Sequence, residues 1–122
     1  QAAARRAALQ SACEQVLQNN TPAEAYGAGE TALAYIRTVL QQPRVRDSRR
    51  IPLENKVFHE KVGRLNGGTA VMVALGFEEE REQESEEEPV RVFLVLNRVY
   101  IDDLRGAVVL LERGQGLLRS HI

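Results

Sequence analysis

A single run of β-branched and aromatic residues, at positions 90–96, stands out in a chain whose other apolar residues mostly follow helical spacing. Pro89 and Asn97 bound this run, and the pattern is typical of a strand. Apart from Arg91 its residues are all apolar, which indicates burial on both faces, or packing of one face by the last helix. A shorter strand is expected to begin at Phe77 and to run into the glutamates that follow. Together these segments predict a small antiparallel hairpin or sheet.

Helical spacing and helix end signals mark the rest of the chain. We expect helices at approximately 3–18, 22–40, 55–65, 69–75 and 101–118. Residues 21–24, Thr-Pro-Ala-Glu, form the signature of a capping box at the start of the second helix. Gly27 and Gly29 lower the helix propensity of that segment and predict a close helix crossing. The order of elements predicts an α+β fold: a mainly helical single domain, 1–122, with a small antiparallel β-sheet and a C-terminal helix.

Three details of these helices can be predicted as well. The inward stripe of the second helix is expected at Leu33, Ile36 and Leu40. The third helix is expected to turn either Val57 or Phe58 inward, together with Val62 and Leu65. Gly76 is expected to end the fourth helix in a left-handed conformation.

The single cysteine constrains the chemistry and the compartment. Cys13 cannot form an intramolecular disulfide, which favours a reducing compartment, so we expect a cytoplasmic location with the nucleus as a second one. A small, buried helix residue describes this thiol better than a nucleophile does. Gln1 is not an initiator residue, so we expect a domain of a larger protein or a processed product. No segment is long and apolar enough for a bilayer, and we expect a monomer that does not associate with membranes.

The net charge of −1 hides an uneven distribution. Segment 78–88 contains eight glutamates and one arginine, which leaves nine acidic and fifteen basic residues elsewhere, a charge of +6. A basic body favours acidic partners. The glutamate segment itself fits a solvated hairpin loop better than a docking site for basic partners. Nucleic acid is not the expected partner, because aromatic residues make up only 5% of the chain.

The candidate catalytic and metal-binding patterns are incomplete. His59 begins a zinc-protease-like helix pattern, but Gly63 occupies the position of the second histidine, so no three-ligand zinc site can form. Residues 63–69 are rich in glycine but lack the lysine of a phosphate-binding loop. Asp102 and Asp103 are adjacent on a helix and point apart, which argues against an acid–base pair. We therefore expect no catalytic residues, no metal and no cofactor.

A binding site for an acidic peptide is the better interpretation. Four arginines precede a helix whose start is capped by Asn55. A helix N-terminus presents unpaired N–H groups and partial positive charge, and arginine presents forked donors that match carboxylates. Tyr35 and Thr38 share one face of the second helix. From spacing alone, Tyr35 fits a core position and a surface position equally well.

The order of several motifs resembles that of the PUB domain, a module of peptide N-glycanases and of UBA- or UBX-containing proteins. The motifs are Asn20-Thr21-Pro22, Tyr35, Leu40 followed by Pro43, Ile51 with Asn55-x-x-Phe58, and Gly76-Phe77-Glu78-Glu79. The resemblance implies a helical domain with a small antiparallel sheet. It also implies a partner: the acidic C-terminal tail of the valosin-containing AAA ATPase, which ends in a Leu-Tyr-Gly-like sequence.

In that family the tyrosine of the tail enters a pocket between the second helix and the segment leading into the third. Carried over by position, Tyr35 forms one wall of this pocket, and Asn55, Val57 and Phe58 form the other. Arg49 and Arg50 are expected to meet aspartates upstream of the tyrosine. The expected peptide-binding residues are therefore Tyr35, Thr38, Arg49, Arg50, Asn55, Val57 and Phe58. The implied function is that of a non-catalytic adaptor in ubiquitin-dependent unfolding or degradation, including ER-associated degradation.

The chain departs from the family at three positions. Thr38 replaces the usual asparagine, Ser48 an aromatic residue, and Pro52 a residue that is often basic. Loss of the amide at position 38 and of the charge at position 52 could each weaken tail binding by roughly 1–3 kcal/mol if the lost bonds were buried. These changes put the ligand in question more than the fold.

Two other functions compete with tail binding. Leu75-Gly76-Phe77 resembles the apolar-Gly-Phe loop of ubiquitin-associated domains and suggests direct ubiquitin binding, although a helix C-cap explains it equally well. The loop from Arg44 to Arg50 suggests nucleic-acid binding, which would weaken steeply with salt.

Overall fold

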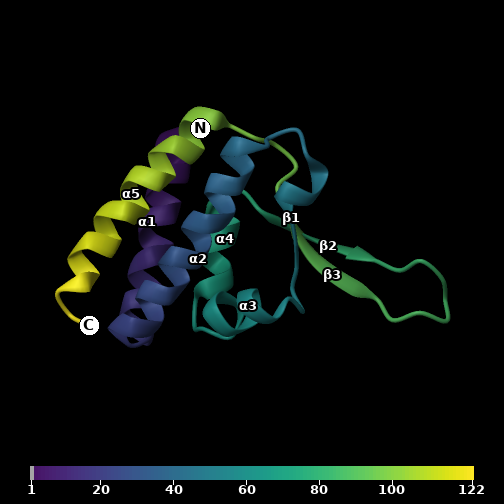
Figure 1. The fold of residues 1–122 in the computed structure, drawn as a ribbon, viewed down its shortest axis with the longest axis horizontal. Helices are drawn as coiled ribbons and strands as arrows, with labels where there is room; N and C mark the ends of the chain where they lie inside the picture. Colours follow the sequence, from purple (N-terminus) through teal and green to yellow (C-terminus); the bar gives the residue numbers. More distant parts are fainter. Residues whose placement is uncertain (1) are drawn as a thin grey trace.

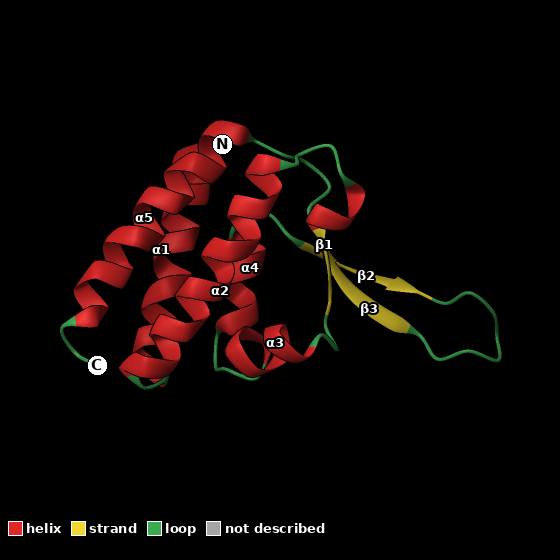
Figure 2. Cartoon of the chain, viewed as in Figure 1, coloured by secondary structure: helices red, strands yellow, loops and turns green. Residues whose placement is uncertain are grey.

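The computed structural model describes residues 2–122. The helices are α1 (Ala2–Asn19), α2 (Pro22–Gln41), the 3₁₀ helix η1 (Arg46–Arg49), α3 (Lys56–Phe58), the π-helical segment η2 (His59–Gly63), α4 (Gly68–Ala74) and α5 (Ile101–Arg119). The strands are β1 (Arg50–Pro52), β2 (Glu78–Glu82) and β3 (Arg91–Val95). The long helices pack together on one side, and the sheet with its projecting β2–β3 hairpin lies on the other (Figures 1 and 2). The predicted α+β class is confirmed.

The predicted capping box opens α2. The hydroxyl of Thr21 accepts the backbone N–H of Glu24 at 3.1 Å, and the Glu24 carboxylate accepts the backbone N–H of Thr21 at 3.0 Å. Arg64 donates to the same carboxylate at 3.3 Å and so links the start of α2 to the turn after η2. The backbone N–H of Thr21, the Thr21 hydroxyl and Arg64 all favour the ionised form, and they lower the pKa of Glu24.

The close crossing predicted near Gly29 is made by α5. A Cβ at Gly29 would lie 2.2 Å from the side-chain oxygen of Gln115, whereas one at Gly27 would make only an ordinary contact. Gln115 is buried, and its amide donates to the carbonyl of Tyr26 at 2.8 Å. A buried polar side chain thus finds its partner where the missing side chain of a glycine lets the two helices approach.

The core lies between the helices and one face of the sheet. Leu33 and Ile36 are buried as predicted, but Val39 takes the third position of the α2 stripe, and Leu40 is only partly buried. Helix α2 packs on both α5 and η2, so its apolar stripe must be wider than one line of residues. No helix among residues 2–122 has the length and apolarity to span a membrane.

The sheet has the order β1–β3–β2 with both pairings antiparallel. Residues 44–50 were expected to be a loop, and this expectation is wrong for residues 46–50: η1 occupies 46–49, and Arg50 begins the edge strand β1. Three residues are too few to show an alternating pattern, and Ile51 pairs with the buried Leu94 only through tertiary contact. Pro52 is compatible with this assignment because an edge strand does not need every N–H.

The two faces of the sheet are covered differently. Ile51 and Leu94 face the core. Phe93 is also buried but lies outside the core cluster, and the guanidinium groups of Arg50 and Arg91 lie 3.6 Å and 4.9 Å from its ring centroid. The prediction that β3 is buried on both faces therefore holds for its centre, with arginines covering the outer face.

The third predicted helix is present but is not a regular α-helix. The N–H of Arg64 donates to the carbonyl of His59, five residues earlier, at 2.9 Å. This π-type bond lies beside Gly63, where a Cβ would lie 3.3 Å from the Phe58 ring. The predicted left-handed glycine after α4 is confirmed, because Gly76 has a φ of 110°.

Glycine substitutions test this packing. A Cβ at Gly68 would lie 2.0 Å from the backbone oxygen of Val62, whereas one at Gly106 meets nothing within 4 Å. We expect Gly68→Ala to destabilise the protein by roughly 3 kcal/mol and Gly106→Ala to stabilise it by roughly 0.5–1 kcal/mol, since the latter only improves helix propensity. Urea denaturation of both variants measures the difference. Equal effects would contradict the close approach of η2 and α4.

Candidate peptide-binding site

Phe58 brings the two walls of the expected pocket together. Its side chain is completely buried, and the Tyr35 ring on α2 packs edge-on against it with centroids 6.2 Å apart. The backbone N–H of the same residue donates to the side-chain oxygen of Asn55 at 3.0 Å. Tyr35 and Asn55, which are 20 positions apart, therefore both contact Phe58.

The side-chain amide of Asn55 uses its oxygen, but not its NH₂ group, in a hydrogen bond within the domain. The oxygen caps the helix that begins at Lys56, as predicted. The NH₂ group makes no hydrogen bond within residues 2–122, and the residue is exposed. A donor of this kind can meet a backbone carbonyl of an incoming peptide.

Val57 and Phe58 divide the roles that the sequence left open. Phe58 points inward and is 0% exposed, whereas Val57 is 58% exposed on the first turn of the helix. Phe58 is thus a support beneath Tyr35 and not a contact surface. Val57 provides the apolar surface beside Asn55.

Tyr35 is half-buried, and this burial raises the pKa of its phenol. Spacing alone left open whether Tyr35 lies in the core or at the surface. Its ring packs on Phe58, while part of the residue remains accessible, so the position is intermediate between the two. One helical turn later, the hydroxyl of Thr38 donates to the carbonyl of Ala34 at 2.9 Å. Thr38 is exposed and retains an acceptor, but it has no amide donor such as the family's asparagine would supply.

Ser48 serves a local structural purpose where the family usually has an aromatic residue. Its hydroxyl lies 2.7 Å from the carbonyl of Gln42 and 2.8 Å from that of Val45, so it ties η1 to the end of α2. Both carbonyls belong to residues three and six positions before Ser48 in the sequence. The aromatic surface expected at this position is absent, and Pro52 adds no charge.

The arginines assigned to upstream aspartates already have partners inside the domain. Arg50 forms an ion pair with Glu82 and lies on the Phe93 ring. Arg49 donates to the carbonyl of Leu96 at 2.9 Å. Their predicted role in peptide binding stays a prediction, and it requires that they act on a ligand without leaving these partners.

Two further contacts, between residues far apart in the sequence, shape this region. Arg46 also approaches Glu82, at 3.5 Å, so the acidic hairpin meets the arginine segment at its base. Arg91 donates to Glu54 at 2.6 Å beside the start of α3. The sequence has opposite charges at these distant positions, but only the register of the strands brings them together.

The features behind the two competing functions are engaged in the fold. Leu75 and Phe77 are both buried, so the apolar side chains of the Leu-Gly-Phe segment face the core. In the arginine segment, three of the four guanidinium groups have the partners described above. Arg44 is exposed.

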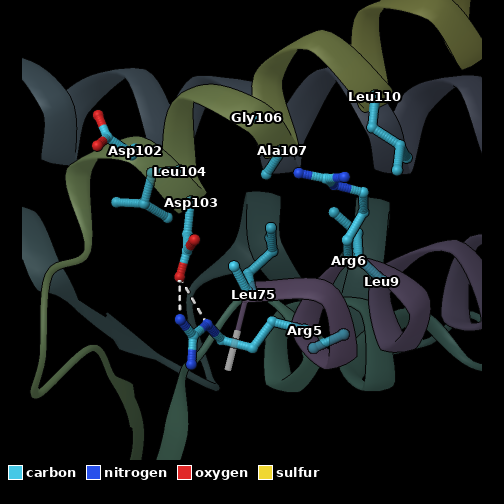
Figure 3. A pocket seen from close by; sticks show the side chains of 12 residues that line it. Arg5, Arg6, Leu9, Leu75, Asp102, Asp103, Leu104, Gly106, Ala107 and Leu110 are labelled. Atoms are coloured by element: carbon cyan, nitrogen blue, oxygen red, sulfur yellow. Dashed lines mark hydrogen bonds and ion pairs between the residues drawn. The ribbon is translucent and has the colours of Figure 1, made fainter.

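Asp102 and Asp103 have separate environments, as expected. Figure 3 shows Asp103 turned toward Arg5 of α1, with its carboxylate 2.6 Å from the Arg5 Nε, and Asp102 turned away. The hollow beside them has a volume of about 60 Å³. Arg5 also stacks on Tyr100 at 4.7 Å, so this pair fastens α1 to the start of α5.

Comparison with known families supports the resemblance seen in the sequence. A model of the PUB domain family matches residues 23–108, more than half of the chain. The matched range contains Tyr35, Asn55 and Phe58, and it ends within α5. No curated protein matched the chain.

The cap at Asn55 can be tested apart from any ligand. Asn55→Ala removes the acceptor of the Phe58 N–H, and we expect a loss of about 1 kcal/mol in the free energy of unfolding. Asn55→Asp keeps an acceptor at a helix N-terminus, and we expect a change below about 0.5 kcal/mol. Urea denaturation measures both. Equal losses would show that the cap oxygen is not the stabilising group.

The thiol of Cys13 provides a second test. It lines an apolar cavity of about 80 Å³, and burial, with a smaller effect of Glu14, raises its pKa to about 11. Because only thiolate reacts, we expect iodoacetamide at pH 7.5 to modify the folded protein about 100-fold more slowly than the protein in urea. The rate should rise with pH up to about 11. Equal rates in the two states would contradict the burial.

Proposed function

This chain belongs to the PUB domain family of protein–protein interaction modules, and we propose that it binds the acidic C-terminal tail of the valosin-containing AAA ATPase. In this role it is a non-catalytic adaptor that links its parent protein to ubiquitin-dependent unfolding and degradation. The ligand is an extended peptide with a tyrosine near its end and acidic residues before it.

The observation that carries the proposal is the convergence on Phe58. The buried ring of Phe58 packs against Tyr35 at 6.2 Å between centroids, and the backbone N–H of the same residue donates to Asn55 at 3.0 Å. Both groups lie within the part of the chain that matches the family. Their positions are the ones at which the family places its tyrosine pocket.

The chemistry of the exposed groups fits such a ligand. Val57 and the accessible part of Tyr35 supply apolar surface for an aromatic ring. The NH₂ group of Asn55 supplies a donor for the backbone next to that ring. A site of this size is expected to bind with a Kd of around 1 μM, or roughly −8 kcal/mol.

The replacements in this chain favour a binding mode centred on Asn55. The amide donor usual at position 38 and the aromatic usual at position 48 are both missing. Asn55, Val57 and Tyr35 therefore carry a larger share of the binding free energy here. Direct ubiquitin binding through Leu75-Gly76-Phe77 is disfavoured, because it would require two buried side chains to leave the core.

Titration with a fluorescent acidic peptide ending in Leu-Tyr-Gly tests the proposal. We expect saturable binding in the micromolar range, and loss of binding when the peptide tyrosine is phosphorylated, because a doubly charged group cannot enter an apolar slot cheaply. Absence of binding at hundreds of micromolar, in a folded sample, would exclude this function.

Matched variants then locate the slot. Val57→Ser and Val73→Ser remove similar side chains that are 58% and 55% exposed, on α3 and α4 respectively. We expect only Val57→Ser to weaken binding, by roughly fivefold, which corresponds to about 1 kcal/mol of lost apolar contact. The phosphorylated peptide gives a separate check of the pocket. If phosphorylated and unphosphorylated peptides bound with equal affinity, the tyrosine pocket would be ruled out, and the peptide would have to bind elsewhere on the domain.

A further inference from the structure

The apolar cavity beside Cys13 lies in the helical half of the domain and is not part of the candidate peptide site. Its volume is about 80 Å³, and residues of α1, α2, η2, α4 and α5 line it. Helix α5 packs on both α1 and α2, which run beside it (Figure 1). Tyr35, Asn55 and Val57 do not line this cavity, so the proposed peptide binding makes no use of it.

The cavity has a buried floor and a mouth that opens to solvent. Four small residues of α2, spaced as one helix face, form part of its lining: Ala25, Ala28, Gly29 and Ala32. The three alanines are buried, and so are the lining residues of η2 and α4. Leu17 of α1 is 48% exposed and Gly114 of α5 is partly exposed, so the mouth lies between α1 and α5.

One buried polar side chain faces this apolar space. Gln115 lines the cavity and is only 5% exposed. Its NH₂ group donates to the carbonyl of Tyr26 at 2.8 Å. The oxygen of the same amide lies beside Gly29, where a Cβ would overlap it, and it accepts no hydrogen bond from residues 2–122. A buried acceptor of this kind destabilises a fold unless a donor reaches it.

Water is a poor partner for this acceptor. A buried water molecule needs about two to four polar partners to be well held. The lining contains no charged side chain, and besides Gln115 its one other polar side chain is the thiol of Cys13, a weak donor. Water in the cavity is therefore weakly held, and an apolar ligand that displaces it gains affinity.

The volume and the lining define the class of ligand. An apolar cavity of about 150 Å³ binds benzene, and this one has about half that volume. Because its mouth is open, a molecule somewhat smaller than benzene, with about four or five non-hydrogen atoms, can occupy it. Such a molecule needs an aliphatic body for the walls and one donor for the oxygen of Gln115.

We propose that this cavity is a binding site for a small aliphatic molecule with one hydrogen-bond donor, such as a short branched alcohol, whose hydroxyl donates to the side-chain oxygen of Gln115. The site shares no residue with the candidate peptide site, so it stands or falls independently of tail binding. It makes Cys13 part of the wall of a ligand site.

Titration with isobutanol, followed by NMR of the backbone amides, tests the proposal. The glycine amides report the location of binding, since Gly29, Gly68 and Gly114 line the cavity whereas Gly106 and Gly116 do not. We expect saturable shifts at the first three glycines, with a Kd of about 1–10 mM, which is the range that about four buried carbons and one hydrogen bond supply.

An isomer of the probe tests the hydrogen bond to Gln115. Methyl isopropyl ether has the same atoms as isobutanol but carries no donor, so it leaves the amide oxygen without a partner. We expect it to bind about five- to tenfold more weakly. Equal affinity of the alcohol and the ether would overturn the proposal that Gln115 selects a donor.

A matched pair of glycine variants tests the location. A Cβ at Gly114 or at Gly116 meets nothing within 4 Å, so Gly114→Leu and Gly116→Leu should both fold. Only Gly114 lies at the mouth of the cavity, and Gly116 is exposed outside it. We expect Gly114→Leu to weaken isobutanol binding at least about tenfold, because the new side chain occupies the entrance, and Gly116→Leu to leave it unchanged.

Two other outcomes would contradict the site. Shifts that grow linearly and equally at all glycines would show a general solvent effect, and the cavity would then be a packing defect without a ligand. Equal affinities of Gly114→Leu and Gly116→Leu for isobutanol would place the bound alcohol elsewhere on the domain.

Discussion

The burial of Phe58 is the interaction on which the candidate site depends. A fully buried aromatic side chain contributes several kcal/mol of transfer free energy, so its position is strongly determined. Tyr35 packs on its ring, and Asn55 accepts a hydrogen bond from its backbone N–H. A core residue therefore holds both surface groups in place. Gly63, beside the π-type bond from Arg64 to His59, leaves space for the ring. The candidate surface on this short helix is therefore anchored from below, because its underside belongs to the core.

A second, electrostatic constraint shapes the opposite face of the sheet. Phe93 is buried by the guanidinium groups of Arg50 and Arg91, which are held in turn by Glu82 and Glu54. Cation–π contacts and ion pairs thus cover the face of the sheet that lies away from the core. The arginines that would attract an acidic peptide are thus also structural, and their orientation leaves a hollow and not an open patch.

Several local features could be predicted because their signals lie within a few residues. The capping box at Thr21, the left-handed glycine at position 76 and the cap at Asn55 all depend on neighbours three or four positions away. Strand β1 could not be predicted in this way, since its three residues gain their hydrogen bonds from β3, more than 40 positions later. The same is true of Arg50, whose ion pair with Glu82 cannot be predicted from its neighbours in the sequence.

The amino-acid sequence alone determined the α+β class, the approximate helix boundaries, the uneven charge and the family resemblance. Each of these depends on composition or on short-range periodicity, which a single sequence displays directly. Only the tertiary structure decided that Phe58 and not Val57 is buried, that Tyr35 and Asn55 both contact Phe58, and that three arginines line one hollow. Those outcomes depend on which distant residues share a contact, and the register of β3 between its two neighbours and the packing of α2 on η2 set those contacts.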